Sequence, residues 1–355
     1  MSIAETIAGL GVPPLSGIAI GCAVLCYLMI WPMMPLFRRY ALARPNARSS
    51  HSVPTPQGGG TAVLMATAAG LLVLAAVMPD SPLRTSRYAA MAAGSLLLAA
   101  TGALDDMFEL PVVPRLVAQF GAAGLGLYAV FGNVWGLFAS GALAGSTGSM
   151  LLLMLPLLLI GLVWFINLTN FMDGIDGITV AEFVPICGAL AVFAELGAIP
   201  LGDGLIAAAL LGALAGFSPY NRHVARLFLG DVGSLFIGFI AGVLLLALAA
   251  DGGVAAALIL PLYYLADATF TLVRRLIRGE IITQAHRTHI YQRATDIGWS
   301  VPAITGRLWL LNSALGVLAI GSLWLSSPVG QALCLCLAAG LVAWVLLAFS
   351  KAPAQ

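Results

Sequence analysis

The chain has 355 residues, 61% of them hydrophobic and only 9% charged, and its formal net charge is +1. Because ordinary soluble domains contain about 25% charged residues, this composition excludes a water-soluble globular protein. It predicts a polytopic integral membrane protein, and the net charge by itself identifies no partner.

Eleven apolar runs follow one another along the chain. Most of them approach the ~20 residues that a helix needs to cross a bilayer. They are 15–37, 59–79, 88–104, 115–131, 149–166, 178–196, 205–218, 233–250, 254–273, 303–326 and 329–349. The seventh run, 205–218, is the shortest. We therefore predict an all-α fold of about eleven transmembrane helices that form a single domain, 1–355.

The loops between these runs carry basic residues unequally. If the N-terminus is outside, 14 of the 16 Lys and Arg residues fall in the inner loops and tail, and only Arg84 and Arg87 fall outside. Because cytoplasmic loops carry the excess of positive charge, we predict an outer N-terminus and a cytoplasmic C-terminus. The acidic residues that occur in groups fall on the same inner side, so the predicted active site lies at the cytoplasmic face.

The most polar stretch follows the fifth run and reads NLTNFMDGIDG, from Asn167 to Gly177. Asn170, Asp173 and Asp176 are three residues apart, so on a helix they would share one face. Oxygen ligands without a nearby Cys or His suit Mg²⁺ that holds a phosphate. The alternative is a solvated loop with Asx turns.

Two inner motifs precede this stretch. The first inner loop contains His51 and ends in three glycines, 58–60, where backbone N–H groups at a helix start favour an anion. The alternative is a plain polar connector.

Asp105 and Asp106 close the third run, and adjacent carboxylates repel each other unless they are paired or bound to a metal. The alternative is a helix-end pair without function.

A further acidic residue precedes the eighth run. Asp231 lies between Gly230 and Gly233 in the stretch FLGDVGS, three residues after Phe228. A carboxylate flanked by glycines can reach a metal ion from a bent backbone. The alternative is an ordinary turn residue.

The last long inner loop contains the stretch HRTHIYQR, with His286, Arg287, His289 and Arg293. Two histidines and two arginines this close together could clasp a pyrophosphate. As zinc ligands they would lack a third partner, whereas a patch for anionic lipid headgroups remains an alternative. Asp267 is an acid inside the ninth run, and such residues are functional by default.

These motifs, in this order, resemble the polyprenyl-phosphate N-acetylhexosamine-1-phosphate transferases. The matching stretches are PTPQGGG, DDMFELPVVPRL, NLTNFMDGIDG, FLGDVGS and HRTHIYQR, between Arg44 and Arg293. The resemblance implies an enzyme of the bacterial inner membrane that moves a sugar 1-phosphate from a UDP-sugar to undecaprenyl phosphate and releases UMP. This reaction is the first membrane step in the synthesis of lipopolysaccharide O-antigen or another cell-envelope polysaccharide.

The resemblance also implies roles for individual residues. Mg²⁺, or Mn²⁺ in its place, would be bound by Asp231 and Asn170, and Asp105 and Asp106 would lie near the acceptor phosphate. The donor would be bound by Asn167, Asp173, Asp176, Phe228, His286, Arg287, His289 and Arg293. The expected partners are a UDP-N-acetylamino sugar, undecaprenyl phosphate and the lipid bilayer, with no nucleic acid. The sequence leaves open whether the chain forms a homodimer.

One departure from the family's pattern indicates which branch of the family this chain resembles. The phospho-MurNAc-pentapeptide translocases carry three consecutive histidines in the last loop, and other branches carry His-x-His-His. This chain has His289-Ile290-Tyr291-Gln292 there, which resembles the branch that initiates O-antigen or teichoic-acid linkage synthesis.

Two other functions are open from the residues alone. A multi-helix transporter would place its polar residues near the bilayer midplane, whereas here they lie at the inner helix ends. A CDP-alcohol phosphotransferase would carry further Asp residues on the helix after Asp176, where this chain has only Glu182.

Overall fold

The structure is a computed structural model that describes residues 14–43, 54–78, 80–139, 146–281, 286–325 and 327–353. Within these ranges the chain is helical apart from one short strand pair. The helices are α2 (Pro14–Tyr40), α3 (Gly59–Val77), α4 (Ser86–Phe108), α5 (Val112–Ala139), α6 (Ser146–Met172), α7 (Ile178–Glu195), α8 (Leu201–Asn221), α9 (Asp231–Ala250), α10 (Val254–Ile259), α11 (Leu262–Ile277), α12 (Ile290–Asp296), α13 (Val301–Trp324) and α14 (Pro328–Phe349).

The all-α polytopic architecture predicted from the sequence is confirmed. In the described ranges, 10 helices are long and apolar enough to cross a membrane. The predicted run 254–273 is broken into α10 and α11. Pro261 stands at the break, where its missing N–H and its ring end a helix. The short run 205–218 belongs to a full-length helix, α8, which has 21 residues.

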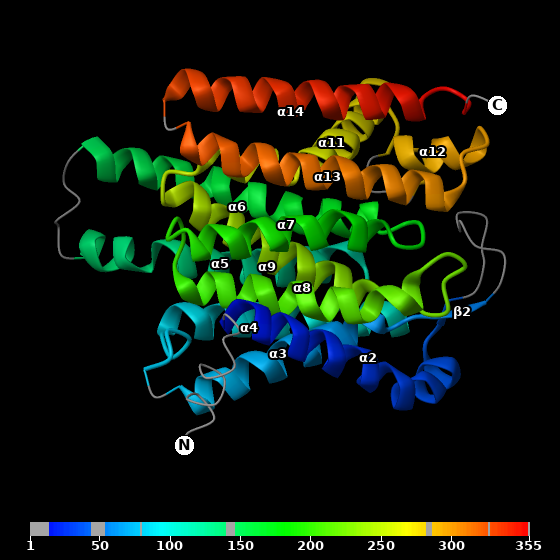
Figure 1. The fold of residues 1–355 in the computed structure, drawn as a ribbon, viewed down its shortest axis with the longest axis horizontal. Helices are drawn as coiled ribbons and strands as arrows, with labels where there is room; N and C mark the ends of the chain where they lie inside the picture. Colours follow the sequence, from blue (N-terminus) through cyan, green and yellow to red (C-terminus); the bar gives the residue numbers. More distant parts are fainter. Residues whose placement is uncertain are drawn as a thin grey trace.

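Most of the helices run side by side along the long axis of the molecule, with α9 at the centre, whereas α11 runs obliquely to them (Figure 1). In the most apolar window of α9, 89% of the residues are buried, against 28% in α14. Helices α3, α4, α5 and α6 all pack on α9. A Cβ built on Gly60 would lie 2.2 Å from the Gly233 Cα, so only glycine lets α3 approach the start of α9 this closely. The central helix therefore begins at a tightly packed point.

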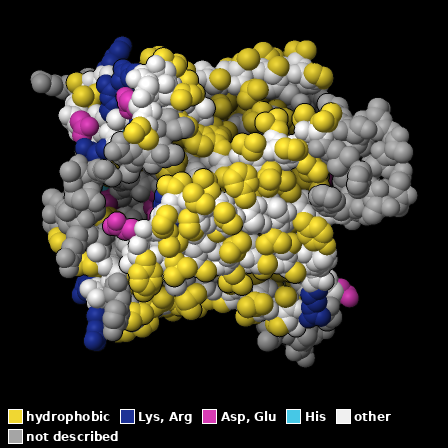
Figure 2. Space-filling view, turned by 180° about the vertical axis from the view of Figure 1, so that it is seen from behind, with side chains coloured by type: hydrophobic (Ala, Val, Ile, Leu, Met, Phe, Trp, Pro, Cys, Tyr) yellow, Lys and Arg dark blue, Asp and Glu magenta, His cyan; other side chains and the backbone are white. Residues whose placement is uncertain are grey.

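The surface matches a molecule embedded in a bilayer. Hydrophobic side chains cover the middle of the face seen in Figure 2, and acidic and basic side chains gather toward the two ends. Figure 1 shows that α2 and α14 run in the same direction, so α2 begins and α14 ends at opposite ends of the bundle.

A small strand pair that the sequence did not predict lies at the end of the bundle where α2 ends. β1 (Leu42–Ala43) pairs antiparallel with β2 (Thr55–Pro56). Beyond β2, Gln57 forms a parallel bridge with Phe228, and Gly59 N donates to the Phe228 carbonyl oxygen at 2.9 Å. The beginning of α3 is therefore tied to the segment that leads into α9. His51 lies outside the described residues.

Candidate active site

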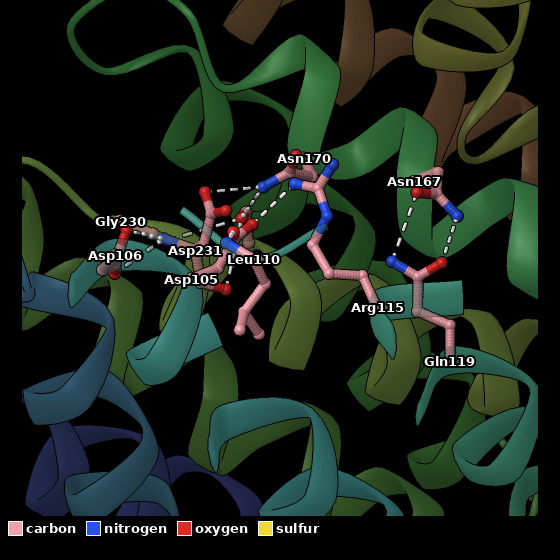
Figure 3. Close-up of polar contacts among 10 residues, drawn as sticks. Asp105, Asp106, Leu110, Arg115, Gln119, Asn167, Asn170, Gly230 and Asp231 are labelled. Carbon is pink, nitrogen blue, oxygen red and sulfur yellow. Dashed lines mark hydrogen bonds and ion pairs between the residues drawn. The ribbon is translucent and has the colours of Figure 1, made fainter. Parts of the chain in front are cut away.

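Carboxylates gather where α4 ends and α9 begins (Figure 3). Both oxygens of Asp106 accept the backbone N–H of Asp231, at 3.2 and 3.1 Å. The first N–H groups of a helix have no intrahelical partner and favour an anion, so this contact fixes Asp106 at the start of α9. A Cβ on Gly102 would lie 2.5 Å from the carbonyl carbon of Asp231. Glycine at position 102 is what allows the two helices to meet.

The neighbouring acid, Asp105, is held by the protein itself. Its Oδ1 accepts Leu110 N at 2.7 Å, and its Oδ2 accepts Arg115 Nη1 at 2.6 Å. Asp105 is also buried, with 8% of its surface exposed, whereas Asp106 is only half-buried. The two acids that the sequence grouped as a pair therefore differ, because Asp105 is ion-paired with Arg115 whereas Asp106 accepts a backbone N–H group.

Asn170 joins α6 to this cluster. Its Nδ2 donates to Asp231 Oδ1 at 2.8 Å and to Ser234 Oγ at 2.9 Å. Asn167, one turn earlier, makes a different contact: its amide and that of Gln119 in α5 donate to each other, at 2.6 and 3.2 Å (Figure 3). Asn170 is therefore in the acidic cluster, and Asn167 joins α6 to α5.

Asp173 and Asp176 occupy the turn between α6 and α7. Asp173 accepts a hydrogen bond from the Thr179 hydroxyl. Burial raises the pKa of Asp173 to about 6, against the lowering effect of that bond, and the charges of Asp106 and Asp176 raise it further. Asp173 is therefore electrostatically part of the cluster.

Asp176 contacts the segment before Phe228. His223 Nδ1 lies 2.7 Å from Asp176 Oδ2, and the same oxygen accepts Ala225 N at 3.1 Å. Phe228 is half-buried, and its own N–H donates to the Pro56 carbonyl oxygen at 2.8 Å. The structure thus brings Asp176 and Phe228 to one loop cluster through contacts that the sequence did not indicate.

Asp267 forms a cap on the short helix α12. It is fully buried and accepts the N–H groups of Ile290 at 2.9 Å and Tyr291 at 3.2 Å. The hydroxyls of Tyr263 and Thr271 donate to it as well, each at 3.2 Å. The intramembrane acid singled out in the sequence therefore anchors the last inner loop to α11.

The four basic residues of the last loop have different surroundings. Arg287 donates to Asp296 at 2.8 Å, and Arg293 is exposed. His289 is 3% exposed, and its Nδ1 has no hydrogen-bond partner among the described residues. Burial lowers the pKa of His286 to about 4, and His289 and Arg275 lower it further. His286 is therefore neutral near pH 7.

The oxygen donors of the cluster fit a hard divalent cation. Asp231 lies beside the like charges of Asp106 and Asp105, and Asn170 adds a neutral amide. Carboxylate and amide oxygens are the ligands of Mg²⁺, and an amide can turn its oxygen toward a cation. No group of three or more His, Cys, Asp or Glu side chains with metal-site geometry occurs among the residues described here. The fit therefore rests on the oxygens of Asp231 and Asn170, with the negative charge of Asp106 beside them.

Glu182, by contrast, is not available to such a site. It is fully buried in α7, and its Oε2 accepts Asn312 Nδ2 at 2.7 Å. A CDP-alcohol phosphotransferase would need further metal-binding acids on this helix, so the packing of Glu182 disfavours that alternative.

Comparison with known proteins shows which family the chain resembles. Residues 88–249, from the start of α4 to the end of α9, match the model for glycosyl transferase family 4. A Bacillus subtilis protein named probable undecaprenyl-phosphate N-acetylglucosaminyl 1-phosphate transferase is 27% identical, over 85% of this chain and 86% of its own length. A Mycolicibacterium smegmatis decaprenyl-phosphate N-acetylglucosaminephosphotransferase is also 27% identical, over 91% of this chain and 84% of its own.

A phospho-N-acetylmuramoyl-pentapeptide-transferase from Methylacidiphilum infernorum is 25% identical, over 86% of this chain and 92% of its own length. The matched family segment contains Asp105, Asp106, Asn170 and Asp231, the residues that meet between α4, α6 and α9. The chain is therefore a multi-pass membrane phosphoglycosyl transferase that matches glycosyl transferase family 4 over residues 88–249 and resembles the polyprenyl-phosphate N-acetylhexosamine-1-phosphate transferases.

Proposed function

We propose that this chain transfers an N-acetylamino-sugar 1-phosphate from a UDP-sugar to undecaprenyl, or another polyprenyl, phosphate and releases UMP. Relatives named as undecaprenyl- and decaprenyl-phosphate N-acetylglucosamine phosphotransferases support the two substrates. The single observation that carries the proposal is the junction of Asp106, Asp231 and Asn170. It lies at a helix end of a hydrophobic bundle, where a lipid phosphate can meet a water-soluble nucleotide.

Asp231 and Asn170 would hold Mg²⁺, with Mn²⁺ as a substitute. The bound ion would supply the positive charge that lets an anionic donor and an anionic acceptor approach each other. The residues favour this use because like charges at the start of α9 are costly unless a cation compensates them.

Of the two adjacent acids, Asp106 is the better candidate to act on the acceptor. Asp105 is buried and held in an ion pair with Arg115, whereas Asp106 is half-buried and accepts a backbone N–H group. Asp106 would take the remaining proton of the acceptor phosphate. An acceptor oxygen would then attack the sugar-bearing phosphorus in line, the bond from that phosphorus to UMP would break, and UMP would leave. A covalent aspartyl intermediate is the second route.

The donor would lie against the turn between α6 and α7 and the neighbouring loops. Asp173 and Asp176 project from that turn, and Asp176 is tied to the segment before Phe228. The loop residues His286, Arg287, His289 and Arg293 would contact the donor phosphates, and Asn167 would support α6 from the side of α5. Because its pKa is low, His286 would act as a neutral hydrogen-bond partner.

We further propose that this site faces the cytoplasm of a bacterium, with the N-terminus outside, and that the product starts O-antigen or another cell-envelope polysaccharide. The unequal distribution of Lys and Arg supports the orientation, as does the placement of the α2 start and the α14 end at opposite ends of the bundle (Figure 1). The proposal that the product starts such a polysaccharide rests on the family resemblance alone.

A panel of donors tests this proposal. The purified protein, undecaprenyl phosphate and Mg²⁺ would be incubated with UDP-GlcNAc, with UDP-N-acetylated 6-deoxy sugars or with UDP-MurNAc-pentapeptide, and the lipid product measured. We expect a product from at least one donor without a peptide. Turnover of UDP-MurNAc-pentapeptide alone, or of no donor, would overturn the proposal.

A further inference from the structure

Tyr291 of α12 reaches across to the end of α6. Its side chain is fully buried, and its hydroxyl donates to the Phe171 carbonyl oxygen at 3.3 Å. Phe171 lies in the last turn of α6, where carbonyl groups have no intrahelical partner. The hydroxyl of Tyr291 therefore satisfies a backbone group three residues before Gly174.

Gly174 is packed directly against the same side chain. A Cβ built on Gly174 would lie 2.2 Å from the Tyr291 hydroxyl oxygen and 2.9 Å from Gln292 Nε2. These distances are shorter than van der Waals contact, so no larger residue fits unless the neighbours move. The backbone of the turn after α6 is thus packed directly against the Tyr291 side chain.

Tyr291 has little freedom to retreat from this contact. Asp267 accepts the N–H groups of Ile290 and Tyr291, which fixes the first turn of α12 to α11. Gln292 Oε1 accepts His289 N at 3.3 Å and closes the same turn from the other side. A displacement at Gly174 would therefore move the turn after α6 rather than α12.

That turn carries Asp173, the residue before Gly174. Asp173 N donates to the Asn170 carbonyl oxygen at 3.3 Å, and the Asp173 side chain accepts the Thr179 hydroxyl. We infer that Tyr291 is a positioning residue for the transfer reaction: through Phe171 and Gly174 it fixes the turn that presents Asp173 to the UDP-sugar. This inference rests on the function proposed above.

A double-mutant cycle tests the contact. Gly174→Ala should raise the apparent KM for the UDP-sugar on the order of 100-fold, because it displaces a substrate-positioning turn. Tyr291→Phe removes one hydrogen bond and should raise this KM about 3- to 10-fold. In the double variant the 2.2 Å contact is gone and the closest remaining atoms are Gln292 Nε2 at 2.9 Å and the ring carbon Cζ at 3.3 Å, so this KM should recover in part, to within about 10-fold of the wild-type value. The KM for polyprenyl phosphate should change less than about twofold in every variant.

Gly306→Ala in α13 is the matched control, because a Cβ there meets no atom within 4 Å. A double variant as impaired as Gly174→Ala, or an equal rise in the KM for polyprenyl phosphate, would overturn the inference. If Gly174→Ala does not purify in folded form, as judged by thermal unfolding, Tyr291→Phe alone decides: an unchanged donor KM refutes the contact. A wild-type protein inactive with every donor would refute the proposed function instead.

Discussion

Replacing Asp231 with Asn separates the stability of the cluster from its chemistry. The amide keeps an oxygen that can accept Asn170 Nδ2, a bond of 2.8 Å in the native protein, and it keeps the size of the side chain. What it removes is one negative charge beside Asp106 and Asp105. The substitution should therefore leave the packing of α9 unchanged and alter only the electrostatics at its first turn.

Asp231→Asn should raise the free energy of unfolding but lower the turnover. Like charges within one such cluster repel each other by a few kcal/mol at an effective dielectric constant of ~20. The favourable interaction of an acid with the start of a helix, about 0.3–1 kcal/mol, is lost at the same time. Without Mg²⁺, Asp231→Asn should therefore raise the free energy of unfolding by about 1 kcal/mol. Turnover should fall by about 10²- to 10³-fold, which corresponds to roughly 3–4 kcal/mol.

Two assays on the same purified protein measure these effects. Thermal unfolding with and without Mg²⁺ should show that Mg²⁺ stabilises the wild-type protein and not the variant, because a ligand stabilises only a fold that binds it. UMP release gives the turnover. Asp251→Asn is the control, since Asp251 is exposed at the opposite end of the same helix. Near-normal turnover, an unchanged response to Mg²⁺, or a destabilised apoprotein would each refute the reasoning.

Other predictions concern the last loop and the topology. Burial lowers the pKa of His286 from 6.5 to about 4, so the fold should lose stability as pH falls through this window; His286→Gln should make the melting temperature less dependent on pH there. The same variant should leave the pH profile of kcat/KM unchanged between about pH 6 and 8, and loss of an acid limb near pH 6.5 would contradict the neutral state of His286. Asp267→Ala removes the acceptor of four hydrogen bonds and should lower the melting temperature and expose α12 to proteolysis; unchanged cleavage would refute the capping role. Cysteines placed at Ser2 and Gln355, in a background without Cys336, should be labelled from opposite sides of the membrane, and labelling from one side would refute the topology.

The sequence predicted the membrane helices well where apolarity alone decides the structure. The run 233–250 became the buried helix α9, and the run 59–79 became α3. The resemblance to the transferase family, rather than the residues alone, implied that Asp231 and Asn170 belong to one site, and the two side chains are 2.8 Å apart in the structure. The break at Pro261 was missed because the residues on both sides of it are apolar and were taken as one run, although the proline itself was a sequence signal for the end of a helix.

Contacts between distant segments explain the remaining differences. The unlike roles of Asp105 and Asp106 depend on Arg115 and on the start of α9, and neither contact follows from the adjacent pair of acids itself. At the start of helix α12 the Gln292 side chain accepts the His289 N–H, whereas the usual sequence signature of a capped helix begins with Ser or Thr. Asp267 likewise caps a helix that begins more than twenty positions later in the chain. From the sequence it could therefore be identified only as an intramembrane acid that is expected to be functional.

The fate of the donor's two phosphates tests the central claim most directly. A UDP-sugar labelled with ³²P on the sugar-bearing phosphate would be incubated with the purified protein, Mg²⁺ and polyprenyl phosphate. If the chain transfers a sugar 1-phosphate, the label should appear in the lipid fraction and unlabelled UMP should be released in equal amount. Label that remains in the nucleotide as UDP, with an unlabelled sugar on the lipid, would contradict the account.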